Sequence, residues 1–191
     1  KLARSGCLAV NITYPSRRDE IEFLAEEAIG RGLSACDEQQ VSKVHFVTHS
    51  LGGILVRQYL DSETLPQLGR VVMLGPPNQG TALVDRMRRV PGWALLGPAA
   101  DVLGTGPDSI FSKLGPVQFE LGVIAGDVNV NPLAALFLEG KNDSVVTVES
   151  TRVVGMDEHL VLPVMHTIMM RNNHLIDQTI HYLKTGNFIP Q

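Results

Sequence analysis

The sequence predicts an α/β fold, in which a mostly parallel sheet is flanked by helices. Short apolar runs rich in Val and Ile alternate along the chain with segments whose apolar residues recur at helical spacing. An alternation of strand and helix is typical of a parallel sheet with helices on its faces. One of the strands turns directly into a helix at Ser50. A chain of 191 residues favours one domain, so we expect residues 1–191 to form a single unit.

The first elements are a helix end, a strand and a helix. Residues 1–6 resemble the last turn of a helix that a glycine ends. Apolar residues alternate over Leu8–Tyr14, which predicts a strand. A helix is expected to begin near Ser16 and to end at Gly30 and Gly32. Its inward face would consist of Ile21, Leu24, Ala25, Ala28 and Ile29.

The stretch from Val44 to Leu60 organises the rest of the chain. It starts as a buried strand and ends as an amphipathic helix, with Ser50 between them. A sharp turn of this kind raises the serine hydroxyl out of the backbone and leaves the N–H of Leu51 free. We expect Gly52 to be required because a side chain there would collide with the strand. The alternative is an ordinary connection in which Ser50 caps the helix.

Three further strands and a final helix complete the expected fold. Strands are predicted at residues 70–75, 121–126 and 159–164, the last at a sheet edge because Pro163 cannot donate to a ladder. A short helical turn is expected at 131–138 and a polar loop at 139–146. The final helix would open at Asn172 or Asn173 and end at Gly186.

An insertion of short helices is expected at about residues 81–115, over the edge of the sheet. It carries many Gly and Pro residues together with apolar ones, including Trp93, Leu95 and Leu96. The insertion could be a lid over an apolar pocket, or it could pack as a simple cap.

Composition excludes several classes of function. The net charge is −4 and the basic residues are scattered, which argues against a nucleic-acid partner. No apolar run approaches 18 residues, so no transmembrane segment is expected. Cys7 and Cys36 have no metal-ligand spacing, and we expect free buried thiols rather than a disulfide. Neither a metal nor a cofactor is predicted, and the oligomeric state is left open.

Three side chains are candidates for nucleophilic catalysis. A serine hydroxyl needs a base to take its proton, and ligand sites of open α/β sheets lie at the carboxyl ends of strands. Ser50, Asp143 and His166 each follow a predicted strand. Ser50 would attack, His166 would act as base and then acid, and Asp143 would hold the imidazole. The Leu51 N–H would stabilise the oxyanion.

Other residues compete for these roles. His174, at the start of the final helix, is an alternative base, whereas His49 and Pro77 are expected to line the substrate site. Alternative acids are Asp157, Glu158 and Asp127.

Five short segments carry a resemblance to a known family. They are residues 14–17, 48–53, 75–81, 142–145 and 166–167. In them the chain resembles the α/β-hydrolase superfamily, and more closely its bacterial lipases and esterases. Thr48 stands where the motif Gly-x-Ser-x-Gly has its first glycine. Similar lipases place the acid in an Asn-Asp loop about twenty residues before the histidine, which agrees with Asp143 and His166.

The resemblance implies a serine hydrolase that cleaves carboxylic esters through an acyl-enzyme, without cofactor. Its partner would be a small ester or lipid. The family also has a strand and a His-Gly loop ahead of the segment that corresponds to Leu8–Tyr14, and that loop donates the second oxyanion N–H. Nothing before Leu8 supplies either, so the resemblance implies a hydrolase without its first segment. A second hypothesis is therefore a catalytically inactive fragment or a binding module that keeps the fold.

Overall fold

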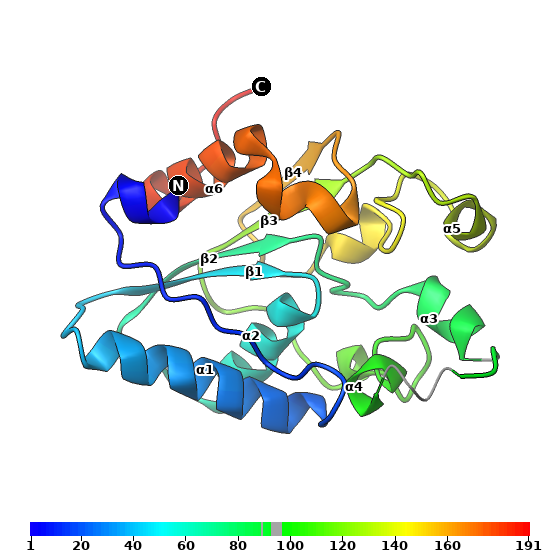
Figure 1. Ribbon diagram of the computed structural model, residues 1–191, viewed down its shortest axis with the longest axis horizontal. Coiled ribbons are helices and arrows are strands. Elements are labelled where there is room, and N and C mark those ends of the chain that lie inside the picture. Colours follow the sequence, from blue (N-terminus) through cyan, green and yellow to red (C-terminus); the bar gives the residue numbers. More distant parts are fainter. Residues whose placement is uncertain (89, 93–96) are drawn as a thin grey trace.

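The computed structural model describes residues 1–88, 90–92 and 97–191, and its centre is a parallel sheet. Figure 1 shows the strands side by side with helices on both faces. The sheet order is β1-β2-β3-β4, and every neighbouring pair is parallel. The strands are β1 (Val44–His49), β2 (Leu68–Leu74), β3 (Leu121–Gly126) and β4 (Glu158–Leu162). The predicted α/β class is confirmed, as is the edge position of the last strand.

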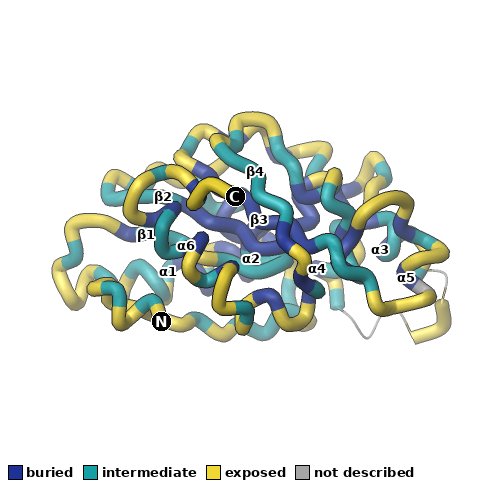
Figure 2. Tube along the Cα trace, turned by 90° about the horizontal axis from the view of Figure 1, so that it is seen from above, coloured by how far each residue is buried: buried dark blue, intermediate teal, exposed yellow. Residues whose placement is uncertain are grey.

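Three long helices cover the two faces of the sheet. Helix α6 (Asn173–Thr185) packs on one face, whereas α1 (Ile21–Asp37) and α2 (Leu51–Ser62) pack on the other. Figure 2 shows the strands as the buried centre between exposed outer surfaces. Apolar side chains of all four strands contribute to the two cores, and every residue of β3 is buried.

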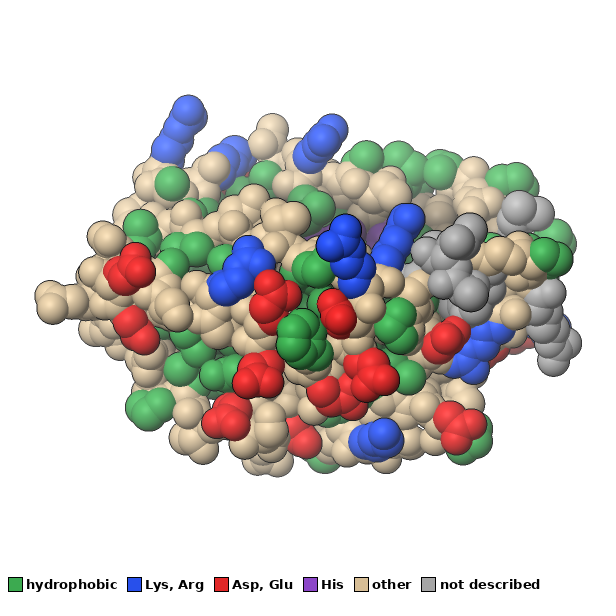
Figure 3. Space-filling model, turned by 60° about the horizontal axis from the view of Figure 1, so that its bottom comes forward, with side chains coloured by type: hydrophobic (Ala, Val, Ile, Leu, Met, Phe, Trp, Pro, Cys, Tyr) green, Lys and Arg blue, Asp and Glu red, His purple; other side chains and the backbone are tan. Residues whose placement is uncertain are grey.

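Helix α1 has the predicted inward face but different ends. All five residues expected to face inward are buried. The helix begins at Ile21 after Glu20 rather than near Ser16, because residues 16–18 form a turn. It continues through Gly30 and Gly32, because neither glycine has the positive φ that ends a helix and the inward face of α1 stays packed. Acidic side chains are spread over the bottom face of the molecule (Figure 3), as a solvated surface requires.

Short helical turns connect these elements. Residues with a positive φ end two of the helices as predicted, namely Gly6 with φ 91° and Gly186 with φ 84°. Asn172 caps α6 by accepting a hydrogen bond from the Leu175 N–H. The short elements are η1 (Leu2–Ser5), α3 (Ala82–Met87), α4 (Pro98–Asp101), η3 (Ile110–Ser112), α5 (Pro132–Phe137), η4 (Glu149–Thr151) and η5 (His166–Arg171).

The strand predicted at Leu8–Tyr14 is wrong. The segment is extended but joins no ladder, and Leu8 and Val10 are 55% and 40% exposed. A strand needs a neighbour to pair with, and among the described residues β1 pairs only with β2. The segment is held by side chains instead, since Ile12 and Tyr14 pack on the cluster that α1 and α2 share.

The later described part of the insertion, residues 97–115, packs on α1 and α2, whereas α3 contacts α5. Ala99, Ile110 and Leu114 are buried in the cluster formed by α1 and α2. Gly97, with φ 85°, lies so close to the Arg17 carbonyl that a Cβ atom would overlap it. Trp93, Leu95 and Leu96 lie outside the described residues, so the lid remains a prediction.

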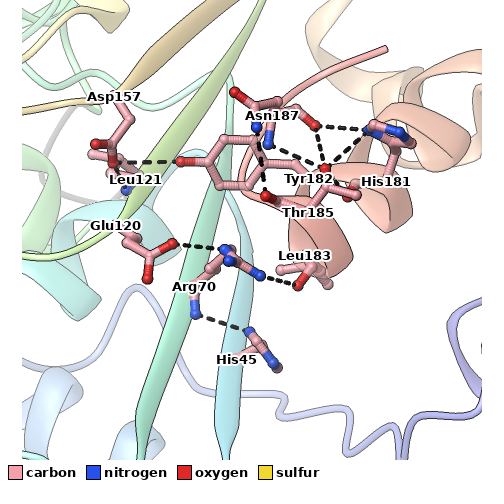
Figure 4. Close-up of polar contacts among 10 residues, drawn as sticks. All are labelled: His45, Arg70, Glu120, Leu121, Asp157, His181, Tyr182, Leu183, Thr185 and Asn187. Carbon is pink, nitrogen blue, oxygen red and sulfur yellow. Dashed lines mark hydrogen bonds and ion pairs between the residues drawn. The ribbon is translucent and has the colours of Figure 1, made fainter.

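The amino ends of the strands are fastened to the end of α6 (Figure 4). The Arg70 guanidinium pairs with Glu120 at 2.7 Å and donates to the Leu183 carbonyl at 3.0 Å. The Tyr182 hydroxyl points toward Asp157 at 3.4 Å, and burial raises the pKa of this phenol. This end of the sheet is therefore filled by structural contacts.

Two further expectations concern cysteines and membranes. Cys7 and Cys36 are free, as predicted, but Cys7 is exposed and Cys36 only half-buried, so the expectation of buried thiols is wrong. No helix within the described ranges combines the length and the apolarity needed to cross a membrane.

Two glycine substitutions test the packing of the sheet. A Cβ atom at Gly122 would lie 2.8 Å from Tyr182 Cε2 and 2.9 Å from Phe188 Cζ. We expect Gly122→Ala to lower the free energy of unfolding by about 1–3 kcal/mol, because overpacking forces the rings to shift. Gly30→Ala is the matched control and should raise it by about 0.5–1 kcal/mol, since the added methyl group meets nothing. Urea unfolding measures both, and equal midpoints would contradict the packing.

Candidate active site

The candidate site lies at the carboxyl ends of the strands. Ser50 follows β1, Gly75 follows β2, and the loop containing Asp143 lies beyond β3. His166 follows β4 and begins η5. Because the carboxyl ends of parallel strands lie at the same end of a sheet, these residues from distant parts of the chain come close together.

Ser50 occupies a sharp turn between β1 and α2. Its φ of 52° and ψ of −123° lie in a region that non-glycine residues rarely adopt, at a cost of about 1–3 kcal/mol. The turn is held because the Ser50 N–H continues the strand pairing with the Leu74 carbonyl at 2.9 Å. The Ser50 side chain makes no capping hydrogen bond, so the simple capping role considered for it is wrong.

The tight glycine at this turn is Gly53 rather than Gly52. A Cβ atom at Gly52 would lie 3.4 Å from Thr48 Cβ, an ordinary contact, so the expected collision is absent. At Gly53 it would lie 3.1 Å from Met73 Sδ and 3.2 Å from Pro76 Cβ. Thr48 fits beneath the turn, although its hydroxyl is buried without a hydrogen-bond partner in the described part of the chain.

The structure brings Asp143 and His166 together. Asp143 is fully buried, and its Oδ2 atom lies 2.7 Å from Nδ1 of His166. Its Oδ1 atom accepts hydrogen bonds from the N–H groups of Val145 and Val146, at 3.0 and 2.8 Å. The backbone N–H of His166 also donates to the backbone carbonyl of Asp143 at 3.0 Å. A carboxylate can only accept, so Nδ1 carries the proton and Nε2 of the neutral ring is free to act as a base.

Gly75 packs directly against this pair, which sequence reasoning missed. A Cβ atom there would lie 3.1 Å from both Asp143 Oδ2 and His166 Nδ1. The residue also has a φ of 54°. Its sequence signals were its place directly after a buried strand, which many turns share, and its place in the segment 75–81.

His49 also contacts His166. Its Nε2 atom lies 3.0 Å from the His166 carbonyl, so Nε2 must carry the proton and donate. The two imidazole rings lie with their centroids 4.7 Å apart and their planes tilted by 45°. Burial and the neighbouring His166 lower the pKa of His49, which favours its neutral form.

Ser50 and His166 are not joined by a hydrogen bond. Within the described residues the Ser50 hydroxyl has no partner, although its neighbour His49 contacts the His166 ring and carbonyl. Hydrogen bonds between nucleophile and base are often long when no substrate is present, so the arrangement is compatible with a serine nucleophile.

The competing residues make contacts elsewhere. His174, the alternative base, is exposed and lies beside Gln191. A histidine that was not a candidate, His45, accepts from the Arg70 N–H at the far end of the sheet (Figure 4). The alternative acids are also engaged. Asp157 accepts from the Leu121 N–H, Glu158 from the Phe188 N–H, and Asp127 pairs with Lys141.

A buried arginine holds the loop after β2. Arg57 of α2 is 5% exposed and donates to the Asn78 carbonyl and side chain at 2.9 and 3.2 Å. Burial lowers the pKa of Arg57 to about 10. Pro77, predicted to line the site, is buried in this same loop. A charged residue among the apolar positions of α2 was the available signal for this contact.

The described residues offer no metal centre. Among residues 1–88, 90–92 and 97–191, no cluster of three or more His, Cys, Asp or Glu side chains could hold an ion. The candidate site brings together Ser50, His166 and Asp143 at the carboxyl ends of the strands.

Comparison with solved structures identifies the fold. The mature form of the Bacillus licheniformis lipase BlEst2 matches with a TM-score of 0.57 and 21% identity, over 80% of this chain and 69% of that chain. The chain has the α/β-hydrolase fold. The propeptide form of BlEst2 matches with a TM-score of 0.61 and 20% identity, over 80% of this chain and 38% of that one.

The α/β-hydrolase fold is also shared with a phospholipase. PlaB from Legionella pneumophila, in complex with thio-NAD, matches with a TM-score of 0.61 and 20% identity, over 79% of this chain and 38% of that one. The chain thus spans well under half the length of PlaB and of the BlEst2 propeptide form. No protein-family model matches the sequence, and no curated protein matches it either.

A histidine away from the site gives a pH-dependent stability. Burial, and then the charge of Arg152, lower the pKa of His159 to about 4, and its Nδ1 atom is buried without a partner among the described residues. In the unfolded chain its pKa is near the ordinary value of about 6.5. The folded state thus binds fewer protons, so the contribution of His159 to stability is complete above pH 6.5 and is lost toward pH 4.

His159→Gln should therefore flatten the dependence of the unfolding free energy on pH between about 6.5 and 4. Urea unfolding at several pH values measures this slope. His174→Gln, at an exposed histidine, is the control and should keep the wild-type slope. An unchanged slope in His159→Gln would contradict the lowered pKa of this half-buried histidine.

Proposed function

We propose that the chain is a serine hydrolase that cleaves carboxylic esters through an acyl-enzyme on Ser50. The observation that carries the proposal is the buried Asp143–His166 pair, joined at 2.7 Å beside the turn that presents Ser50. A carboxylate that fixes an imidazole near a strained serine is the arrangement that activates a hydroxyl. Lipase and phospholipase are the names of two structural neighbours, which supports an ester or lipid substrate.

The reaction would proceed in two halves. Ser50 Oγ attacks the ester carbonyl carbon while its proton passes to Nε2 of His166, and the carbonyl oxygen becomes an oxyanion. The C–O bond to the leaving alcohol then breaks, and His166 gives the proton to that alcohol. Water repeats the sequence on the acyl-enzyme and releases the carboxylic acid and Ser50. Asp143 holds the imidazole tautomer throughout and stabilises the imidazolium.

The Leu51 N–H would be one oxyanion donor. It lies at the first position of α2, where a helix leaves its N–H groups without partners in the helix. The partial positive charge of the helix N-terminus adds to this effect. His49 and Pro77 are proposed to line the site, one against His166 and the other in the loop after β2.

A second candidate is a binding module that keeps the fold without turnover. The observation that favours it is the absence of a hydrogen bond between Ser50 and His166 within the described residues. The two candidates differ in whether Ser50 is activated, so a reactive probe separates them.

Labelling tests the nucleophile. We expect a fluorophosphonate probe to modify Ser50 of the purified chain, because its hydroxyl is the one presented at the turn beside His166. Peptide mass spectrometry locates the adduct. Ser50→Ala should lose the adduct together with hydrolysis of a p-nitrophenyl ester. A cooperatively folded wild-type chain without adduct would favour the binding module, and turnover that survives in Ser50→Ala would exclude this nucleophile.

A pair of aspartate substitutions tests the acid. Asp143→Asn should lower kcat by about 10⁴-fold, as loss of the triad carboxylate does when the geometry is kept. Asp157→Asn is the matched control and should retain kcat, because Asp157 accepts from the Leu121 N–H at the other end of the sheet. Ester hydrolysis by both variants is compared at equal concentrations of folded protein. A large loss in Asp157→Asn alone would mean that the acid is assigned to the wrong residue.

A further inference from the structure

We propose that Tyr14 is a catalytic residue whose hydroxyl donates the second hydrogen bond to the oxyanion. This inference rests on the proposed function, because it concerns the tetrahedral intermediate formed at Ser50. Two donors aimed at the developing charge are the usual requirement of acyl transfer. The Leu51 N–H supplies one, and no strand beside the free edge of β1 supplies another within the described residues.

The first argument is the position of the phenol. A Cβ atom added to Gly52 would lie 3.6 Å from the Tyr14 hydroxyl oxygen. Gly52 is the residue after Leu51 in the first turn of α2, so the hydroxyl lies beside the turn that holds the other donor. The Tyr14 ring packs on the cluster that also receives the Leu51 side chain.

The second argument is the side of Ser50 on which the phenol lies. The Asp143–His166 pair packs against Gly75, at the end of β2. Tyr14 belongs to the segment before α1, which packs on α1 and α2 and runs past β1 (Figure 1). Strand β1 is the edge strand opposite to β4. The general base and the oxyanion donors of a serine hydrolase must act on different sides of the attacked carbonyl. The base takes the proton of the serine, whereas the donors bind the carbonyl oxygen. We assign Tyr14 to the oxygen because its hydroxyl approaches the turn at Gly52, whereas the Asp143–His166 pair approaches it at Gly75.

The third argument is the state of the hydroxyl. Among the described residues the Tyr14 hydroxyl has no hydrogen-bond partner, although the side chain is partly buried. Its oxygen is not one of the buried unpartnered atoms of the described residues, so it is open to solvent and this donor is available to a ligand. Burial raises the pKa of Tyr14, which keeps the proton on the oxygen at neutral and mildly alkaline pH.

The backbone holds Tyr14 in place. The Ser16 N–H donates to the Tyr14 carbonyl at 3.0 Å, and the Arg18 N–H donates to the Pro15 carbonyl at 2.9 Å. Gly97 lies against the Arg17 carbonyl from the other side. A donor fixed in this way requires little reorganisation when the oxyanion forms, which is the condition for effective stabilisation of a transition state.

Tyr14→Phe tests the proposal. The substitution removes only the hydroxyl and leaves the ring packed. We expect kcat for a p-nitrophenyl ester to fall by about 100- to 1,000-fold, the size of effect known for one oxyanion donor, while KM stays within about threefold. A boronic acid inhibitor, whose tetrahedral adduct on Ser50 carries a similar oxygen, should bind less tightly in the variant. Thermal unfolding should be close to that of the wild type.

Tyr59→Phe is the matched control, because Tyr59 packs on the same apolar cluster and belongs to the same helix as Leu51. It should retain kcat and inhibitor affinity. If wild type is active and Tyr14→Phe keeps kcat within threefold, Tyr14 is not the donor and the proposed function stands. If Tyr14→Phe and Tyr59→Phe lose activity and thermal stability together, the role of Tyr14 is packing and the inference is wrong. If wild type neither turns over ester nor reacts with fluorophosphonate, the proposed function fails and this inference fails with it.

Discussion

The buried carboxylate of Asp143 is the constraint on which the site depends. A fully buried carboxyl group is costly unless its oxygens are hydrogen-bonded, and here two backbone N–H groups and an imidazole donate to them. Meeting that requirement forces a tight loop, with a φ of 85° at Ser144. It also demands small neighbours. A Cβ atom on Gly126 would lie 2.9 Å from Asp143 Cβ, and one on Gly75 would press on the paired atoms. The carboxylate therefore determines residues in three separate segments.

The turn at Ser50 is a second and independent constraint. Its strained backbone is sustained from below by β2, through the hydrogen bond to Leu74 and the close contact of Gly53 with Met73. Arg57 extends this support, because it fastens the loop after β2 to α2. Strain at a serine is maintained only when the surroundings determine its conformation, and here the strand and the loop after it do so. The fold class thus predicts the turn, whereas its rigidity depends on side-chain packing.

How much of this the sequence could predict depends on the range of the interaction. The parallel sheet, the inward face of α1 and the glycine stops at Gly6 and Gly186 follow from local periodicity and conformation, and they were predicted correctly. The bounds of α1 were not, because interior glycines do not end a helix that packing holds. The strand at Leu8–Tyr14 was wrong for a different reason. Its pattern is that of a strand, but a ladder requires a partner and a pattern cannot show whether one is present. The contacts of Gly75 and Tyr14 with the site are likewise tertiary.

The wrong strand prediction bears on the proposed oxyanion donor, because β1 pairs on one side only within the described residues. Had residues 8–14 joined a ladder, backbone hydrogen bonds would fix their register. Instead they are held by Ile12 and Tyr14 on the helices, and by the Arg31 guanidinium, which donates to the Thr13 carbonyl at 3.1 Å. The position of the Tyr14 hydroxyl therefore depends on the packing of its ring as well as on the backbone turn that follows it. A segment fixed by side chains is more easily displaced than one fixed by a ladder, so the position of Tyr14 is more sensitive to how α1 and α2 pack than the positions of Asp143 and His166 are.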